Sequence, residues 1–178
     1  ISIGEAGGFV LLEKAPPTQG CGNGVAFLGY GESSDGYHMS SPHPDGTGAK
    51  LAMSAALQRG GVQPREVDYI NLHGTATPAN DRAEDTAVHA IFGDATPASS
   101  TKGWTGHALG AAGIVEAIVS ILCLSRGFLP GTLNTRERDT VMRSRILLEN
   151  EERPLRRVLS NSFGFGGNNC SLLFGCID

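Results

Sequence analysis

The 178-residue sequence predicts an α/β domain with a mixed β-sheet and helices on both of its faces. Short apolar runs typical of strands alternate along the chain with longer segments that have helical spacing. The chain ends in two strand-like segments around a glycine-rich tip, which predicts a hairpin. Hydrophobic residues make up 40% and charged residues 18% of the chain, which is typical of a folded domain.

The first half of the chain is expected to contain three strands and two helices. Gly60 and Gly93 follow the two helical segments, at the place where glycine commonly ends a helix. The polar segment 32–45 contains two prolines and is expected to form a surface loop. The predicted elements are strands at 9–13, 25–30 and 67–72, and helices at 45–59 and 80–92.

The second half is expected to contain one long helix, at 108–126, and the final hairpin, with strands at 158–162 and 171–174. The helix is apolar on nearly every face, so it should be buried between layers. Glu116 lies on this helix, and a buried carboxylate is costly unless a cation is near it.

Composition excludes several classes of function. The formal net charge of −4 argues against a nucleic-acid surface, and without a CxxC pair we expect no metal site of the zinc-ribbon type. The four scattered cysteines favour a reduced, cytoplasmic protein. No signal peptide is visible, and the longest apolar run, 117–124, is too short to span a bilayer. Because the chain begins without Met, we expect it to be part of a longer protein.

Three clusters carry the candidate chemistry. The first follows the strand at 67–72, the second precedes the helix at 108–126, and the third is the tip of the hairpin. Each also has a purely structural explanation: a histidine bonded within its own loop, a solvated lysine beside a helix cap, and an ordinary tight turn. The sequences are His73-Gly74-Thr75-Ala76-Thr77, Lys102-Gly103-Trp104-Thr105-Gly106-His107 and Phe163-Gly164-Phe165-Gly166-Gly167.

Taken in order, the clusters resemble the late motifs of one family of condensing enzymes. A segment Gly4-Glu5-Ala6-Gly7-Gly8 precedes them, acidic residues follow the first cluster, and Glu116 lies nine residues beyond His107. From Gly4 to Phe174 the chain is similar to the β-ketoacyl-acyl-carrier-protein synthases with two active-site histidines. The resemblance implies the C-terminal half of the thiolase-like fold, which is layered α-β-α-β-α in the intact enzyme. Residues 1–14 would be the last strand of the N-terminal half, and 15–178 the C-terminal domain.

The resemblance implies a decarboxylative Claisen condensation in fatty-acid, polyketide or aryl polyene synthesis. A cysteine takes an acyl group from the carrier protein, a malonyl-carrier thioester loses CO2, and the resulting carbanion attacks the acyl-cysteine. His73 and His107 correspond to the histidines that stabilise the enolate oxygen, and Lys102 to the lysine that orders the site. Fixed donors around a developing oxyanion provide a large part of such catalysis, and a neutral imidazole has one N–H to donate.

Other positions are implied by the resemblance alone. They form a polar network around the catalytic lysine and a set that binds the substrate and its pantetheine arm. The network comprises Asp81, Glu84 and Glu116, and the substrate-binding residues are Thr75, Thr77 and Phe165. Two departures from the family pattern stand out: Ala76 replaces a usual glycine, which we expect to have little consequence, and Trp104 replaces a smaller or unbranched residue.

The nucleophilic cysteine of the family is expected outside this chain. It lies in a Thr-Ala-Cys-Ser-like turn of the N-terminal half, and all four cysteines here lack that context, so we expect structural thiols. The chain by itself should therefore be inactive. The resemblance requires no cofactor. It implies three partners: an acyl carrier protein, the missing N-terminal half, and a second subunit in a homodimer or heterodimer.

Two alternatives remain open. A non-catalytic subunit resembling a chain length factor would share the fold and lack the cysteine, although it has no chemical need for His73, Lys102 and His107 together. A thiolase would need a cysteine base near a Gly-His pair, an arrangement that Cys170 and Cys176 lack. The docking patch for an acidic carrier protein would lie on the missing half or among four arginines that are otherwise an ordinary solvated surface. These are Arg136, Arg138, Arg143 and Arg145.

Overall fold

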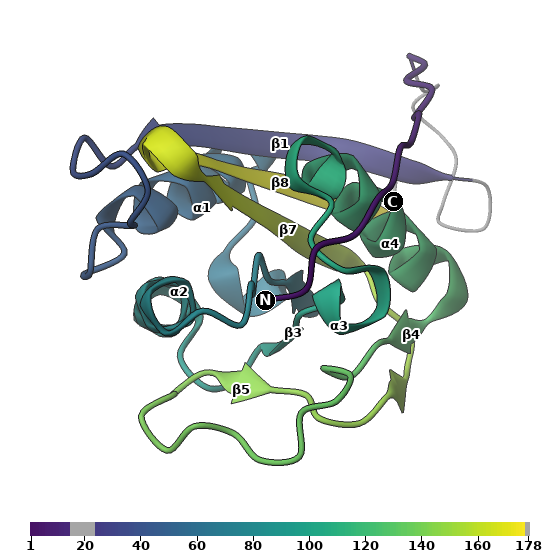
Figure 1. Ribbon diagram of the computed structural model, residues 1–178. Helices are drawn as coiled ribbons and strands as arrows, with labels where there is room; N and C mark the ends of the chain where they lie inside the picture. The colour runs from purple at the N-terminus through teal and green to yellow at the C-terminus, as the bar shows by residue number, and fades with distance from the viewer. Residues whose placement is uncertain (15–23, 177–178) are drawn as a thin grey trace.

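The structure is a computed structural model that describes residues 1–14 and 24–176. Its centre is a six-stranded sheet in the order β1-β8-β7-β2-β3-β5 (Figure 1). The first three strands in that order pair antiparallel and the last four pair parallel, so the mixed sheet is confirmed. The strands are β1 Val25–Ser34, β2 Tyr69–Asn71, β3 Pro97–Ser99, β5 Arg145–Ile146, β7 Arg157–Gly164 and β8 Asn168–Cys176. A separate pair joins β4 Phe128–Leu129 to β6 Glu151–Glu152.

Helices cover both faces of this sheet, as expected (Figure 1). Neighbouring residues of each strand point to opposite faces. Ile70 and Leu159 therefore pack into the core formed with α1 and α2, whereas Tyr69 and Val158 pack into the core formed with α4. The helices are α1 Thr47–Gly60, α2 Pro78–Phe92, the short α3 Lys102–Thr105 and α4 Ala112–Arg126, with 3-10 turns η2 Pro64–Glu66, η3 Leu109–Ala111 and η4 Phe165–Gly167.

Glycines at two kinds of position shape these elements. Gly31 lets α1 lie directly on β1, because a Cβ at this residue would come within 1.8 Å of the Ala52 carbonyl oxygen. At the hairpin tip, Gly166 and Gly167 have φ angles of 77° and 75°, in the left-handed region that favours glycine. The predicted hairpin between β7 and β8 is confirmed, with strands longer than expected.

The N-terminal segment differs from the prediction. Residues 9–13 form no strand, and Phe9, Leu11 and Leu12 are exposed. The segment runs past α4 instead, where a Cβ at Gly8 would touch the Ile118 side chain at 2.7 Å. The division between residues 14 and 15 stays a prediction, since 15–23 lie outside the described residues.

The long apolar helix is not buried on every face in this chain. Its buried residues lie on the side that packs against β7, whereas Leu122 is 50% exposed. The expectation of burial all round is therefore wrong for the chain by itself. The reason is that, within the described residues, the outer side of α4 is covered only in part.

Helix α4 together with η3 also has the length and apolarity to cross a membrane. The 18 residues Leu109–Arg126 have a mean hydropathy of 1.7. The core helix of a soluble protein meets the same criterion, so this property is weak support for a membrane span. In this fold the apolar residues are explained by packing on the sheet, and the buried side of the helix contains an ion-paired Glu116.

Candidate active site

His73 is the second residue beyond the C-terminal end of β2, and a buried carboxylate fixes its loop. The backbone N–H groups of His73 and Gly74 donate to the two carboxylate oxygens of Glu84, each at 2.8 Å. The Asn161 side chain donates to the same carboxylate at 3.2 Å. Burial raises the pKa of Glu84, and these donors oppose the rise. Glu84 therefore acts as an anchor that holds the histidine loop against the sheet.

Lys102 joins this loop to helix α4. Its Nζ donates to the backbone carbonyl of His73 and to the carboxylate of Glu116, and it lies 3.3 Å from Nδ1 of His73. The two charged side chains are 6% and 3% exposed. Ser162 Oγ donates to the other carboxylate oxygen of Glu116 at 3.4 Å. The structure thus brings together the lysine and the buried carboxylate that the sequence predicted to need a cation.

His107 faces His73 edge to face. The centroids of the two imidazole rings are 5.2 Å apart, and the ring planes form an angle of 82°. The chain's own beginning holds the His107 backbone: its N–H donates to the Ser2 carbonyl at 2.7 Å, and its carbonyl accepts from Gly4 N–H at 3.1 Å. The N-terminal segment is therefore part of the framework of the site.

The hydrogen bonds define the same tautomer for both imidazoles. Nδ1 of His107 accepts from the backbone N–H of Leu109 at 3.3 Å, and Nδ1 of His73 faces the ammonium of Lys102. Each Nδ1 is thus an acceptor, so in a neutral ring the proton lies on Nε2. Within residues 1–14 and 24–176, both Nε2 atoms lack a hydrogen-bond partner. Each ring can therefore offer an N–H to a bound molecule.

Both imidazoles are held in the neutral form. Burial, followed by the charge of Lys102, lowers the pKa of His73 to about 2. The same two causes lower the pKa of His107, which is closer to solvent. Neutral rings with a free Nε2–H are hydrogen-bond donors for a carbonyl oxygen or an enolate, so the pair fits a site that stabilises negative charge on oxygen.

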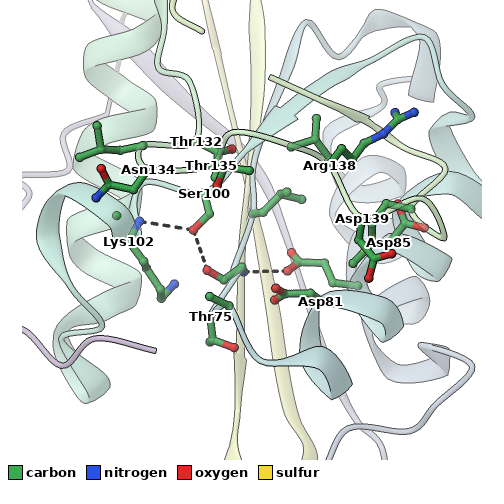
Figure 2. Close-up of a pocket in the computed structure, with 18 of the residues that line it drawn as sticks. Thr75, Asp81, Asp85, Ser100, Lys102, Thr132, Asn134, Thr135, Arg138 and Asp139 are labelled. Atoms are coloured by element: carbon green, nitrogen blue, oxygen red, sulfur yellow. Dashed lines mark hydrogen bonds between the residues drawn. The ribbon is translucent and has the colours of Figure 1, made fainter. Parts of the chain in front are cut away.

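A cavity of about 410 Å³ adjoins Lys102 and His107. Figure 2 shows Thr75 and Lys102 on one side of it and Arg138 and Asp139 on another. Ser100 Oγ, on its wall, donates to the Gly74 carbonyl at 2.7 Å and accepts from Lys102 N–H at 3.3 Å. The cavity thus extends from the back of the histidine loop to the segment between β4 and β5.

The other predicted site residues lie at different distances from the histidine pair. Thr75 and Thr77 are hydrogen-bonded to each other through their hydroxyls at 2.8 Å. Asp81 accepts from the Asn80 side chain at 3.1 Å and lies on the cavity wall, outside the hydrogen bonds of the Lys102 network. Phe165 is at the hairpin tip and is 80% exposed, so the structure does not bring it to the histidines.

Several contributing residues were missed by the sequence reasoning. Phe163 is the aromatic neighbour of His73, with ring centroids 6.0 Å apart. Ser100, Asn161 and Ser162 support the loop and the ion pair. Phe163 lies in the third cluster, and the other three lie within two residues of the second or third cluster, which was the available signal. Their partners, however, depend on the tertiary fold.

The loop that carries His73 contains two residues in the left-handed region. Gly74 has φ 39°, and a Cβ there would lie 2.5 Å from the Cβ of Ser100. Ala76 has φ 59°, a conformation that costs an L residue about 1–2 kcal/mol. Alanine in place of the usual glycine is therefore a strained choice, and the expectation that it has little consequence is wrong for the backbone.

The three cysteines that the structure describes do not form a nucleophile site. Cys123 and Cys170 carry free thiols, and burial raises the pKa of Cys123 to about 12 and also raises that of Cys170. Such thiols are poor nucleophiles. Cys176 is disulfide-bonded, so the expectation of four reduced thiols is wrong for this residue. Within the described residues, no group of three or more His, Cys, Asp or Glu side chains is arranged to hold a metal ion.

Comparison with known proteins gives a consistent result. A family model described as the β-ketoacyl synthase C-terminal domain matches residues 25–136. The mitochondrial 3-oxoacyl-[acyl-carrier-protein] synthase of Arabidopsis thaliana is 43% identical over 184 residues, which cover 98% of this chain and 40% of that protein. The 3-oxoacyl-[acyl-carrier-protein] synthase 1 of Escherichia coli K12 is 42% identical over 96% of this chain and 42% of its own length. The chain thus spans about two fifths of these relatives.

Solved structures support the same assignment. The ketosynthase ApeO in complex with its chain length factor ApeC, from Xenorhabdus doucetiae, matches with 45% identity and a TM-score of 0.81 over 91% of this chain and 40% of that one. A β-ketoacyl synthase from Burkholderia phymatum matches with 36% identity and a TM-score of 0.81 over 86% of this chain and 38% of that one. The C-terminal half of a thiolase-like fold is thereby confirmed, and the chain belongs to the β-ketoacyl synthase family.

Proposed function

We propose that the protein containing this chain is a 3-oxoacyl-acyl-carrier-protein synthase and that this chain supplies the decarboxylation half of its active site. The observation that carries the proposal is the pair of neutral imidazoles, 5.2 Å apart, whose Nε2–H groups are free to donate. Donors fixed before the reaction stabilise an oxyanion without reorganisation. The names of the relatives, which are 3-oxoacyl-acyl-carrier-protein synthases, support the same reaction.

In the proposed step, the thioester oxygen of a malonyl group accepts hydrogen bonds from His73 and His107. The bond between the carboxylate carbon and the α-carbon breaks, its electron pair moves into the thioester enolate, and CO2 leaves. The α-carbon then attacks an acyl-cysteine, and the cysteine thiolate leaves. Lys102 acts through His73, because its ammonium at Nδ1 keeps the proton on Nε2.

The nucleophilic cysteine and half of the layered structure are proposed to lie in a part of the protein outside this chain. Within the described residues, Phe9, Leu11 and Leu12 are exposed apolar side chains that such a half would cover. They follow Gly8, which lies against Ile118 of the half-covered helix α4. We propose that residues 1–14 become a strand of the N-terminal half when it is present. The chain by itself should form no condensation product, and measurable product from it would contradict this division of the site.

A second candidate is a subunit of a ketosynthase–chain length factor pair. Two structural neighbours are such complexes, ApeO with ApeC and the ishigamide ketosynthase with its chain length factor. Retention of both histidines and Lys102 favours the catalytic member of a pair. The residue at the nucleophile position decides the question: cysteine indicates the enzyme, and another residue indicates the partner.

The proposed partner is an acyl carrier protein that brings the malonyl and acyl groups. One structural neighbour is a type II polyketide synthase acyl carrier protein in complex with its ketosynthase. The cellular compartment stays a prediction, because relatives are named as mitochondrial and as chloroplastic proteins. The choice between fatty-acid and polyketide or aryl polyene synthesis depends on the acyl group accepted.

The test uses the intact protein and malonyl-loaded carrier protein. We expect His73→Ala and His107→Ala each to abolish most of the CO2 release, while transfer of an acyl group to the cysteine persists. His89→Ala is the matched control, since His89 lies on α2 outside the site. CO2 release at the wild-type rate in both site variants would reject the assignment of the pair.

A further inference from the structure

We propose that the cavity behind the His73 loop is the route by which CO2 leaves the site, an inference that rests on the proposed function. The cavity has one end at the catalytic side chains and the other at a solvent-exposed loop. It would let the small product escape while the substrate arm is still in place.

The position of the cavity supports an exit separate from the substrate path. The cavity is lined by Lys102 and His107 and also by Arg138 and Asp139, which belong to the exposed segment between β4 and β5. Figure 2 shows Lys102 on the opposite side of the cavity from Arg138 and Asp139. The hairpin tip 163–169 contributes nothing to the lining, nor does the loop 35–46, which bonds to that tip through Met39 and Gly166. A carrier arm that passes the hairpin tip and Thr77, which is also absent from the lining, meets this cavity only at Thr75 and leaves the rest of it open.

The lining suits a small neutral molecule. Apolar side chains form much of the wall, and the volume of about 410 Å³ is several times the roughly 30 Å³ that one water occupies in the liquid. The apolar residues are Leu72, Val88, Leu133, Met142 and Ile146. CO2 is small, linear and without net charge, so it gives up little hydration free energy when it enters such a space.

The charged groups around the cavity discriminate against anions. Five acidic side chains line it, against two cationic ones. A carboxylate or bicarbonate would meet mainly like charge there, whereas CO2 would not. The acidic residues are Asp81, Glu84, Asp85, Glu137 and Asp139, and the cationic residues are Lys102 and Arg138. The cavity therefore lets CO2 pass out to solvent, and its negative charge opposes the entry of bicarbonate or free malonate.

An exit of this kind has a chemical reason. Loss of CO2 involves no proton transfer: one carbon–carbon bond breaks and its electron pair stays in the enolate. Until CO2 leaves, the thioester enolate can recapture it and re-form the malonyl thioester. Product release limits the rate of many enzymes, and a separate path removes CO2 without withdrawing the arm that holds the enolate.

The test fills the cavity with bulk in the intact protein. Met142→Trp and Thr135→Trp place an indole on the cavity wall, and Val141→Trp is the matched control, because Val141 is 54% exposed on the same loop and absent from the wall. Three quantities are measured: the rate of acyl transfer to the cysteine, the rate of malonyl decarboxylation, and the carbon-13 isotope effect at the malonyl carboxylate.

We expect both cavity variants to slow decarboxylation several-fold, to leave acyl transfer unchanged, and to move the isotope effect towards unity. The isotope effect falls because slow escape lets the enolate recapture CO2. The release of CO2 then limits the rate in place of carbon–carbon bond breaking. A slowed reaction with an undiminished isotope effect would mean that the variants distort the histidines, and it would overturn the route. Unchanged decarboxylation in both variants would also overturn it. Absence of malonyl decarboxylation in the wild type would instead reject the proposed function.

Discussion

Replacing Lys102 by methionine should be among the most damaging changes in the chain. The Lys102–Glu116 pair is buried, with side chains 6% and 3% exposed, and removal of one partner leaves an uncompensated carboxylate. Such a loss typically costs about 3–5 kcal/mol. The His73 carbonyl loses a donor at the same time. We therefore expect the free energy of unfolding of the Lys102→Met variant to fall by about 3–5 kcal/mol.

Urea unfolding followed by circular dichroism measures this loss. The double variant Lys102→Met with Glu116→Gln should regain a substantial part of it, because the buried charge is then removed as well. Arg145→Met is the matched control: its ion pair with Glu151 is 46% and 35% exposed, and its loss should cost less than about 1 kcal/mol. The reasoning is refuted if Lys102→Met costs no more than the control, or if Glu116→Gln restores nothing.

Three further predictions concern the same loop and the hairpin tip. The pKa of His73 in the folded state lies far below that of a free imidazole, so below pH 6.5 the folded state binds fewer protons than the unfolded state. The free energy of unfolding therefore decreases as the pH is lowered. Relative to His73→Asn, the wild type should lose up to about 1.4 kcal/mol per pH unit between pH 6.5 and 4.5 in urea titrations, and parallel curves would contradict this. Ala76→Gly should stabilise by up to about 1 kcal/mol and Gly74→Ala should destabilise by about 2–5 kcal/mol, measured as shifts in thermal midpoint; equal effects would exclude the backbone argument. Phe165→Ala should change stability by less than about 0.5 kcal/mol while altering the condensation rate of the intact protein, and a large loss of stability would show a packing role.

The elements that local pattern determines could be predicted from the sequence. Glycine stops ended α1 and α2 close to the expected residues, and the glycine-rich tip correctly indicated the final hairpin. The strand predicted at 9–13 was wrong because an apolar run indicates that its side chains need to be buried but does not identify the element that buries them. The same limit applies to α4, whose outer face has too few neighbours in the described chain.

The candidate site divides in the same way. The resemblance placed Glu116 in the polar network around Lys102, and the helix pattern independently predicted that the buried Glu116 needs a cation. The tautomers could not be predicted, since they depend on one backbone N–H and on an ammonium from a different element. Ala76 was misjudged because its φ angle is a property of the folded loop.

The central claim is that both imidazoles are neutral at pH 7 with the proton on Nε2. Nitrogen-15 NMR of the histidine side chains in the intact protein tests it directly, with His73→Asn and His107→Asn used to assign the signals. The account predicts an unprotonated Nδ1 and a protonated Nε2 for both rings across pH 6–8. A proton on Nδ1 of either ring, or an imidazolium at pH 7, would contradict it.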